Sequence, residues 1–273
     1  MGSLLVAVAG FLDARSQEGR WLLRIDDLDT PRVSQDAERE ILTSLECHGL
    51  YWDGEPVHQQ EHLALYEQAL NELVLKDCTF PCTCRRKDID RTVGCVRNCC
   101  SVTTEPQQPH SIRMRLSLHD IEVHDEIQGT MHGREWSTIE NIAIWRREGI
   151  PTYPLAVVVD DNIMGITHII RGSDLAANTV QQLSLLAELG WKRPRYAHIP
   201  VLNDRSGEKL SKRDEATTID KRHARQNVIW SMQLLGMDPP QRMTLDDLLN
   251  WGIEHWSRYR IPSEPSLSSF VSA

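Results

Sequence analysis

Two pairs of closely spaced cysteines are the residues of this sequence best suited to holding a metal ion. Cys82 and Cys84 are separated by one residue, Cys95 and Cys99 by three, and ten residues lie between the pairs. Four thiolates can complete the tetrahedral shell of Zn²⁺, and the intervening loop can bring the two pairs together. Cys100 is an alternative to Cys99, and reduced cysteines without metal are the alternative to the site. We expect structural zinc, because a closed shell of four sulfurs leaves no position for substrate.

A polar loop near the end of the chain's α/β region carries two lysines that flank a serine. Lys209, Ser211 and Lys212 lie in the segment GEKLSKR, which a glycine opens. Cationic donors in a mobile loop can stabilise the negative charge that develops on phosphate oxygens during phosphoryl or adenylyl transfer. A solvated basic loop is the alternative, and this string alone does not decide between the two.

Three further residues follow or begin apolar runs and could together hold an amino acid. Asp26 follows the run at 20–25, Tyr153 begins a second run and Arg171 ends a third. Ligands of parallel α/β sheets bind beyond the carboxyl ends of the strands. There Asp26 would take an ammonium group, and Arg171 a carboxylate, favourably through two hydrogen bonds. Taken singly, Arg171 could instead pair with Asp174, and Tyr153 could belong to the core.

The elements that must position these residues alternate between helices and strands. Helical spacing and caps predict helices over 3–16, 34–47, 59–76, 174–189, 220–235 and 244–259. Apolar or alternating runs predict strands over 20–25, 111–118, 142–147, 153–159, 163–170 and 198–202. Gly49 and Gly190 stand where helix C-caps are expected. This alternation predicts an α/β fold with a largely parallel sheet.

Composition limits the classes of protein to which the chain can belong. It has 273 residues, of which 40% are hydrophobic and 25% charged, as in ordinary globular proteins. No apolar run approaches the roughly 20 residues that span a bilayer, and the apolar start lacks the basic region of a secretory signal. We therefore expect a cytoplasmic protein with no membrane contact and reduced cysteines. The net charge of −9 argues against wholesale coating of nucleic acid, although a local basic groove stays compatible with it.

The order of these segments resembles the class I glutamyl-tRNA synthetases and their short relatives, the glutamyl-Q tRNA(Asp) synthetases. The resemblance rests on FLDARSQEGRWLLRIDDLDTPR, FPCTCRRKDID, YPLAVVVDDNIMGITHIIRGSDL, RYAHIPVLNDRSGEKLSKRDEA and LLGMDPPQRMTLDDLLNWGIEHW, which cover nearly the whole chain in order. It implies a class I synthetase-like Rossmann fold, with helices on both faces of a parallel sheet. The implied divisions are two catalytic halves at 1–76 and 151–215, a zinc-binding insert at 77–150 and a helical segment at 216–273.

The same resemblance implies an activity and a set of site residues. The family activates L-glutamate with ATP and Mg²⁺ to glutamyl-adenylate, then transfers glutamate to the queuosine base in the anticodon of tRNA(Asp). By position, the implied contacts are Asp26, Tyr153 and Arg171 to glutamate; Gly2, Ser3 and Lys212 to ATP; Lys209, Ser211 and Lys212 in catalysis; and Cys82, Cys84, Cys95 and Cys99 to zinc. A monomer is implied. The alternatives are a glutamyl-tRNA synthetase fragment that charges a tRNA 3′ end, and a non-catalytic zinc-containing tRNA-binding protein.

The sequence departs from the family pattern in four places. Asp26 stands where the family has Glu, so its reach is one methylene shorter and a water can bridge the gap. Cys95 stands where Tyr is common among the zinc ligands, and Pro154 where Gln is usual. The family's first strand and its ATP-contacting His have no counterpart ahead of Gly2. Met1 is therefore expected to be an internal methionine of a longer product rather than the start of a shortened protein, and this form is expected to bind ATP poorly.

Overall fold

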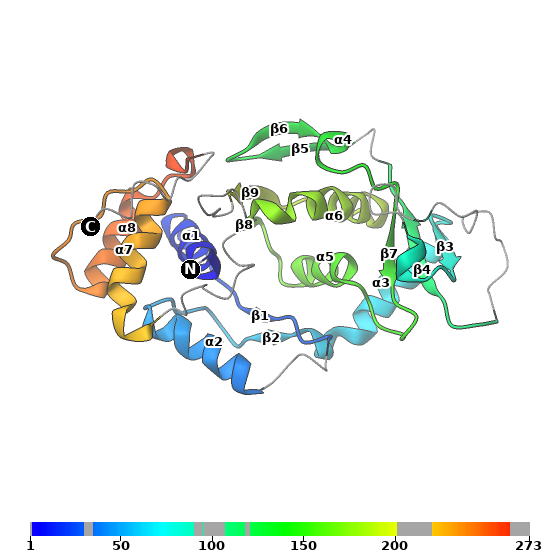
Figure 1. Cartoon of the computed structure of the whole chain (residues 1–273), viewed down its shortest axis with the longest axis horizontal. Coiled ribbons are helices and arrows are strands. Elements are labelled where there is room, and N and C mark those ends of the chain that lie inside the picture. The colour runs from blue at the N-terminus through cyan, green and yellow to red at the C-terminus, as the bar shows by residue number, and fades with distance from the viewer. Residues whose placement is uncertain are drawn as a thin grey trace.

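A four-stranded sheet occupies the middle of the molecule (Figure 1). The computed structural model describes residues 2–29, 35–89, 95, 107–117, 121–200 and 220–262. The sheet has the order β6-β5-β9-β8, formed by β5 (Glu122–Asp125), β6 (Gly129–His132), β8 (His168–Gly172) and β9 (Arg195–Ile199). Strands β5, β9 and β8 run parallel, and β6 is an antiparallel edge strand. The expected α/β class is confirmed.

Helices cover both faces of this sheet, and each face has its own hydrophobic core. One core contains α3 (Leu63–Leu75), α5 (Tyr153–Ile163) and α6 (Ala176–Leu189), and the other contains α1 (Gly2–Ser16), α7 (Ala224–Leu234) and α8 (Leu245–His255). On β8, Ile169 packs against the first core and Ile170 against the second. This is the alternation of side chains that a two-faced strand requires.

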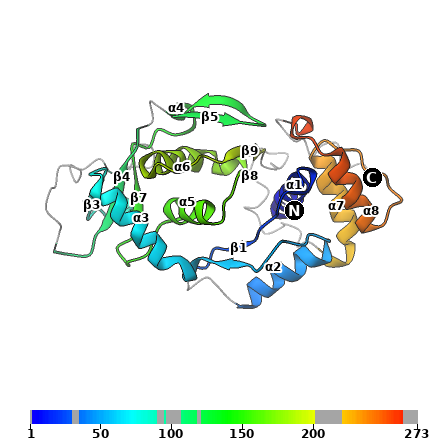
Figure 2. The ribbon, with the colours of Figure 1, turned by 180° about the vertical axis from the view of Figure 1, so that it is seen from behind.

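Two smaller sheets flank the central one. Parallel β1 and β2 lie beside α2, whereas the antiparallel sheet β3-β4-β7 lies at the end of the molecule opposite α7 and α8 (Figure 2). The remaining elements are β1 (Arg24–Ile25), α2 (Gln35–Cys47), β2 (Val57–His58), β3 (Thr79–Cys82), β4 (Ser111–Arg115), α4 (Gly133–Trp136) and β7 (Asn141–Trp145). Short 3₁₀ turns precede α3, α6 and α7, so the expected helices at 59–76, 174–189 and 220–235 each begin with one.

The core on the α5–α6 face draws residues from across the expected domain divisions. It contains Tyr66 of α3, Met114 of β4, Val123 of β5 and Leu155 of α5. The segment 77–150 therefore contributes β5 and β6 to the central sheet and shares a core with residues of both 1–76 and 151–215. The division of the chain into four parts stays a prediction.

Several helix boundaries were predictable from local chemistry. The helices expected at 3–16 and 34–47 are present as α1 and α2, and α6 ends at Leu189. Gly190 and Gly49 have φ of 69° and 72°, the left-handed conformation of a helix C-cap that favours glycine. Within the described part of the chain, no helix combines the length and the apolar character needed to cross a membrane.

The strand predicted over 153–159 is wrong, because these residues form the start of α5. The run of valines favoured a strand, but it is buried on every side, and a buried helix and a buried strand share that pattern. Pro154 lies in the first helical turn, where its missing N–H costs nothing and its fixed φ suits the helix. Tyr153 consequently begins a helix and does not begin a strand.

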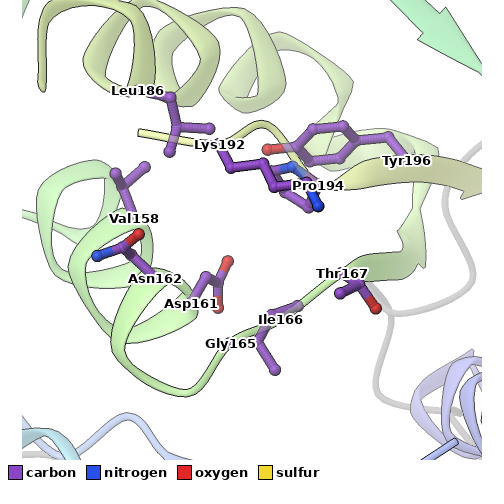
Figure 3. Close-up of a pocket in the computed structure, with 10 residues that line it drawn as sticks. All are labelled: Val158, Asp161, Asn162, Gly165, Ile166, Thr167, Leu186, Lys192, Pro194 and Tyr196. Carbon is purple, nitrogen blue, oxygen red and sulfur yellow. The ribbon is translucent and has the colours of Figure 1, made fainter. Parts of the chain in front are cut away.

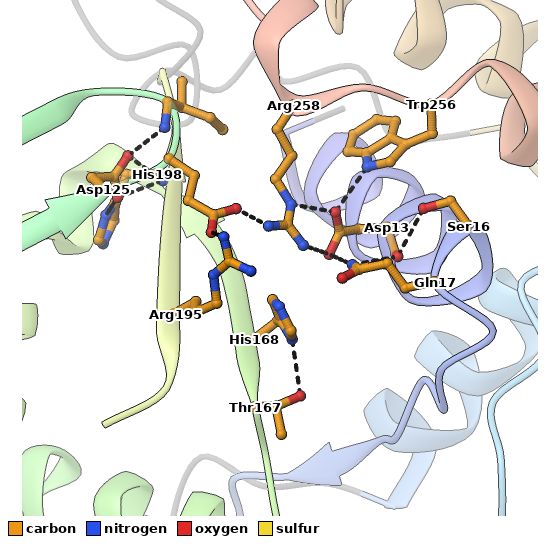
Figure 4. A network of polar contacts seen from close by, with 12 residues as sticks. Asp13, Ser16, Gln17, Asp125, Thr167, His168, Arg195, His198, Trp256 and Arg258 are labelled. Carbon is orange, nitrogen blue, oxygen red and sulfur yellow. Dashed lines mark hydrogen bonds and ion pairs between the residues drawn. The ribbon is translucent and has the colours of Figure 1, made fainter. Parts of the chain in front are cut away.

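A cluster of ion pairs joins the C-terminal segment to α1 and to the central sheet (Figure 4). Asp13 of α1, whose side chain is 4% exposed, accepts hydrogen bonds from Trp256 Nε1 at 2.8 Å and from Arg258 Nε and Nη2 at 2.5 and 2.8 Å. Arg258 also pairs with Glu126, which in turn pairs with Arg195 at the start of β9. The Arg258 guanidinium therefore fixes α1 against the sheet.

We expect Arg258→Met to lower the free energy of unfolding by about 3 kcal/mol, because it leaves the buried Asp13 carboxylate without its cation. Chemical denaturation of the whole chain measures this loss. The control is Arg260→Met, an exposed arginine on the same turn, which should change stability by less than about 0.5 kcal/mol. Equal stability of the two variants would contradict the assigned role of Arg258.

Candidate active site and metal site

Arg171, near the carboxyl end of β8, has a guanidinium that is bonded only to neutral groups among the described residues. It is 7% exposed. Its Nε donates to His198 Nε2 at 3.2 Å, and its Nη2 donates to Thr179 Oγ1 at 2.6 Å and Gln182 Oε1 at 2.8 Å. The ring of Tyr196 lies 5.4 Å from the guanidinium carbon. No described carboxylate lies within ion-pair distance, so this buried cation calls for an anion from elsewhere.

The central sheet explains why these groups meet. Arg171 and His198 are paired in register on β8 and β9, and Asp125 is paired with Tyr196 on β5 and β9. In-register residues on neighbouring strands point to the same face, so Asp125, His198 and Arg171 form a row across three strands beneath α6. Thr179 and Gln182 reach this row from α6, where they lie three residues apart on one helical face.

Asp125 is a buried carboxylate whose donors all come from the surrounding sheet and its hairpin turn. His198 Nδ1 donates to Oδ2 at 2.6 Å, as Figure 4 shows, and the backbone N–H groups of Ile127 and Gln128 donate to Oδ1 at 3.0 and 2.7 Å. Burial alone raises the pKa of Asp125, but the hydrogen bonds from His198, Gln128 and Ile127 outweigh it and hold that pKa below its usual value. The residue is therefore ionised and fixes the His198 ring.

The bonds already made by Arg171 restrict how it can receive a carboxylate. Its Nε and both hydrogens of its Nη2 are engaged, which leaves Nη1 as the donor without a partner among the described residues. A carboxylate bound through two different nitrogens would have to displace His198, Thr179 or Gln182. In this arrangement, within the described part of the chain, Nη1 is the donor open to a carboxylate, and two-nitrogen pairing stays a prediction.

Tyr153 borders the same neighbourhood from the first turn of α5. It is half-buried and follows Thr152, the extended N-cap residue of that helix. Burial raises the pKa of Tyr196; Arg171 opposes that rise, while the nearby Asp161 and Tyr153 add to it. Tyr153, Asp161 and Arg171 thus all act electrostatically on the buried Tyr196, and the roles of Tyr153 and Arg171 toward glutamate stay predictions.

Asp26 is linked to Asp161 through Arg24, an arginine that the sequence analysis did not single out. Arg24 Nε pairs with Asp26 Oδ1 at 2.7 Å, Arg24 Nη1 pairs with Asp161 Oδ1 at 2.8 Å, and Asp160 lies 3.6 Å from Nε. Burial alone would lower the pKa of Arg24, but its carboxylate neighbours outweigh burial and raise it. Three carboxylates around one guanidinium leave this side of the site negative, which suits an ammonium group. Asp26 is 45% exposed and is reachable from solvent.

The remaining predicted nucleotide-binding residues are only partly described. Gly2 and Ser3 are exposed in the first turn of α1, where backbone N–H groups can receive an anion. Lys209, Ser211 and Lys212 lie outside the described residues. The roles of all five toward ATP stay predictions.

A cavity of about 280 Å³ lies between α5 and α6 near the ends at which β8 and β9 begin, and it shares Asp161 and Tyr196 with the surroundings of Arg171 (Figure 3). Thr167 and Pro194, which precede β8 and β9, line it together with Asp161, Lys192 and Tyr196. None of the three predicted glutamate contacts lines it. Because ligands of parallel sheets bind at the carboxyl ends of strands, we assign this cavity no part in the candidate site.

The cysteines of the predicted metal site converge as their spacing suggested. Cys82, Cys84 and Cys95 are at most 9% exposed, and their sulfur atoms lie within 4.8 Å of one another. Cys95 Sγ is 3.7 Å from each of the other two. Zn–S bonds of about 2.3 Å place sulfurs about 3.8 Å apart in a tetrahedron, so the three thiols fit a thiophilic metal. Cys99 and Cys100 lie outside the described residues.

Asn141 of β7 holds the cysteine loop against the antiparallel sheet. Its Oδ1 accepts from the backbone N–H of Cys95 at 2.9 Å and from Arg113 Nε at 2.8 Å. Arg147 Nη2 donates to the carbonyl of Cys84 at 3.1 Å. These contacts fix the backbone that presents the sulfurs, which is the supporting role that groups behind a metal's ligands play.

Sequence reasoning missed the polar residues that support Arg171 and Asp26, namely Arg24, Asp125, Thr179, Gln182 and His198. A signal was present for two of them. His198 falls within a predicted strand and Asp125 ends an alternating segment, and a polar side chain on the inner face of a buried strand requires a partner. Identifying that partner required the strand order, which the sequence did not give.

Comparison with known proteins agrees with this architecture. The family model described as tRNA synthetases class I (E and Q), catalytic domain, matches residues 1–245. A protein of Pectobacterium atrosepticum named glutamyl-Q tRNA(Asp) synthetase is 38% identical over 100% of this chain and 86% of its own length. One of Chromobacterium violaceum with the same name is 38% identical over 97% and 91%. A glutamate-tRNA synthetase structure from Elizabethkingia anophelis superimposes with a TM-score of 0.78 at 21% identity, and the chain spans 64% of its length.

We expect Asp125→Asn to lower the free energy of unfolding by about 2 kcal/mol at pH 7, because an amide cannot accept all of these donors. Since the folded pKa is depressed, the stabilisation by the carboxylate is present above the unfolded pKa of about 4 and is lost as the pH falls through the folded value. Denaturation at a series of pH values should therefore show the difference between the two proteins narrowing in acid. Glu122→Gln, an exposed site on the same strand, is the control and should change little at any pH. A pH-independent difference would contradict this account.

Proposed function

The chain belongs to the catalytic-domain family of the class I tRNA synthetases (E and Q), and from that premise we propose that it ligates glutamate to tRNA. Members of this family are synthetase-like ligases, and relatives at 34–38% identity over nearly the full chain carry one name, glutamyl-Q tRNA(Asp) synthetase. The proposed reaction has two steps: ATP with Mg²⁺ activates L-glutamate to glutamyl-adenylate, and the glutamyl group then passes to tRNA.

Arg171 is the observation that carries this proposal. A guanidinium that is 7% exposed, with neutral partners and one nitrogen left over, favours a small anionic ligand. A carboxylate of glutamate would supply the missing charge. A neutral amino acid side chain would leave both the cation and its Nη1 donor uncompensated, so the same feature supports selection of an acidic substrate.

Asp26 and Tyr153 are the other proposed glutamate contacts. Asp26, in a negative region near Arg24 and Asp161, would hold the ammonium group, and the Tyr153 hydroxyl would orient the substrate. The shorter side chain of Asp26 reaches the ammonium directly or through a water. We propose that Lys209, Ser211 and Lys212 contact the phosphates of ATP together with Gly2 and Ser3, because cations and helix N-termini stabilise developing phosphate charge.

The acceptor is the finer part of the proposal. The relatives' name supports the queuosine base of tRNA(Asp) as the site that receives glutamate. We further propose that the chain works as a cytoplasmic monomer. We also propose that Cys82, Cys84, Cys95 and Cys99 hold a structural Zn²⁺, with Cys100 as the alternative fourth ligand; three of these sulfurs converge at a spacing that suits the ion.

Incorporation of labelled glutamate into defined tRNAs tests the proposed acceptor. With ATP and Mg²⁺, tRNA(Asp) that contains queuosine should be labelled, whereas the same tRNA transcribed without modified bases should not. Both tRNAs have the same 3′ end, so charging of the 3′ end would label both, whereas transfer to queuosine would label only the first. Labelling of the unmodified transcript would instead indicate charging of the 3′ end. Because this form is expected to bind ATP poorly, the assay is run at saturating ATP, and labelling of neither tRNA under that condition would contradict ligation to tRNA.

Removal of the metal should destabilise the fold around β3, β4 and β7. We expect a chelator to lower the thermal midpoint, and Cys84→Ser to lower both the midpoint and the zinc content measured by elemental analysis, because metal binding and folding are coupled. Cys47→Ser is the control, since this exposed cysteine of α2 lies outside the cluster. A thermal midpoint that is unchanged by chelator, in a protein without bound zinc, would contradict the proposed zinc site.

A further inference from the structure

The hydrogen bonds of the polar residues beneath α6 assign a different role to each ring nitrogen of His198. Asp125 can only accept, so His198 Nδ1 must carry a hydrogen, with an N–O distance of 2.6 Å. Arg171 can only donate, so His198 Nε2 must accept from its Nε at 3.2 Å. His198 Nε2 therefore faces the guanidinium as an acceptor, while Nδ1 donates to Asp125.

Thr179 completes this arrangement. Its hydroxyl oxygen accepts from Arg171 Nη2 at 2.6 Å and lies 2.9 Å from His198 Nε2, and the Leu175 carbonyl at 3.5 Å is an acceptor for its hydrogen. Asp125, His198 and Thr179 are spaced like the orienting acid, the base and the nucleophile of a catalytic triad, in that order. His198 and Thr179 are both 0% exposed, however, so no substrate can reach the hydroxyl, and nucleophilic catalysis is excluded.

We propose that His198, fixed by Asp125, is a positioning residue that holds the Arg171 guanidinium so that Nη1 faces the carboxylate of the substrate. This inference rests on the proposed function, in which Arg171 binds glutamate. Rotation about the last bonds of an arginine side chain normally lets the guanidinium adopt several orientations and bind different partners. Here the acceptor nitrogen of His198 and the hydroxyl of Thr179 occupy Nε and Nη2, so the remaining donor has one direction.

Two amide substitutions separate the two halves of this role. The Gln amide reaches the place of the imidazole Nε2, so His198→Gln keeps an acceptor for Arg171 and loses the contact with Asp125. The shorter Asn amide reaches the place of Nδ1, so His198→Asn keeps the Asp125 contact and loses the acceptor. We expect His198→Asn to weaken glutamate binding by at least tenfold and His198→Gln by less than about threefold, a ratio typical of one hydrogen bond to a charged group.

Calorimetric titration of the whole chain with glutamate measures these affinities, and the thermal midpoint measures the folding of each variant. Because His198 is buried and a variant could fail to fold, Thr179→Val and Thr179→Ser form a second pair. Val has nearly the shape of Thr without its hydroxyl, and Ser keeps the hydroxyl. Glutamate affinity should fall several-fold with Val and stay near the original value with Ser, while the KM for ATP in pyrophosphate exchange is unchanged by either.

The outcomes distinguish failure of the positioning role of His198 from failure of the proposed function. Suppose that the original chain binds glutamate, that both His198 variants have a lower thermal midpoint, and that the two variants bind glutamate with equal affinity. His198 is then structural only, and the positioning role is overturned. Equal affinities of Thr179→Val and Thr179→Ser would also overturn it. If the original chain binds no glutamate, the proposed function fails and this inference fails with it.

Discussion

A buried guanidinium has to be surrounded by acceptors that cannot move away, because leaving it unpaired in a low-dielectric interior costs several kcal/mol. Arg171 imposes this requirement on the centre of the molecule. Among the described residues His198, Thr179 and Gln182 bond all but one of its nitrogens, and the Tyr196 ring lies 5.4 Å from its guanidinium carbon. A carboxylate among these residues would have neutralised the cation and closed the site. Because these partners are neutral, the positive charge of Arg171 is left for an anionic ligand to compensate.

The parallel sheet fixes the positions of these residues. Register places Arg171 beside His198, and Asp125 then anchors the histidine from the next strand along. On the other face, α1 packs against α7 and α8, and the Asp13–Arg258 pair fixes α1 to the turn between β5 and β6 through Glu126. The hairpin that carries Asp125 is therefore held from both faces of the sheet, which couples the rigidity of the site to the packing of the C-terminal helices.

Much of the architecture could be predicted from sequence because it follows local rules. Helix caps at Gly49 and Gly190 and the close spacing of cysteines depend on neighbours along the chain; both caps and the convergence of Cys82, Cys84 and Cys95 are present in the structure. The nature of α5 could not be predicted from its valines, since tertiary burial masked its period. Nor could the support of Arg171, because Asp125 and His198 are 73 residues apart and meet only through strand order. The lysine loop, outside the described residues, stays a prediction.

The central claim is that Arg171 makes the site a receptor for an acidic amino acid. Calorimetric titration of the chain with glutamate and with glutamine tests it most directly, because the two ligands have nearly the same shape and differ in one charge. The account predicts that glutamate binds and that glutamine binds at least tenfold more weakly, since the amide cannot compensate the guanidinium. Equal binding of the two would contradict it.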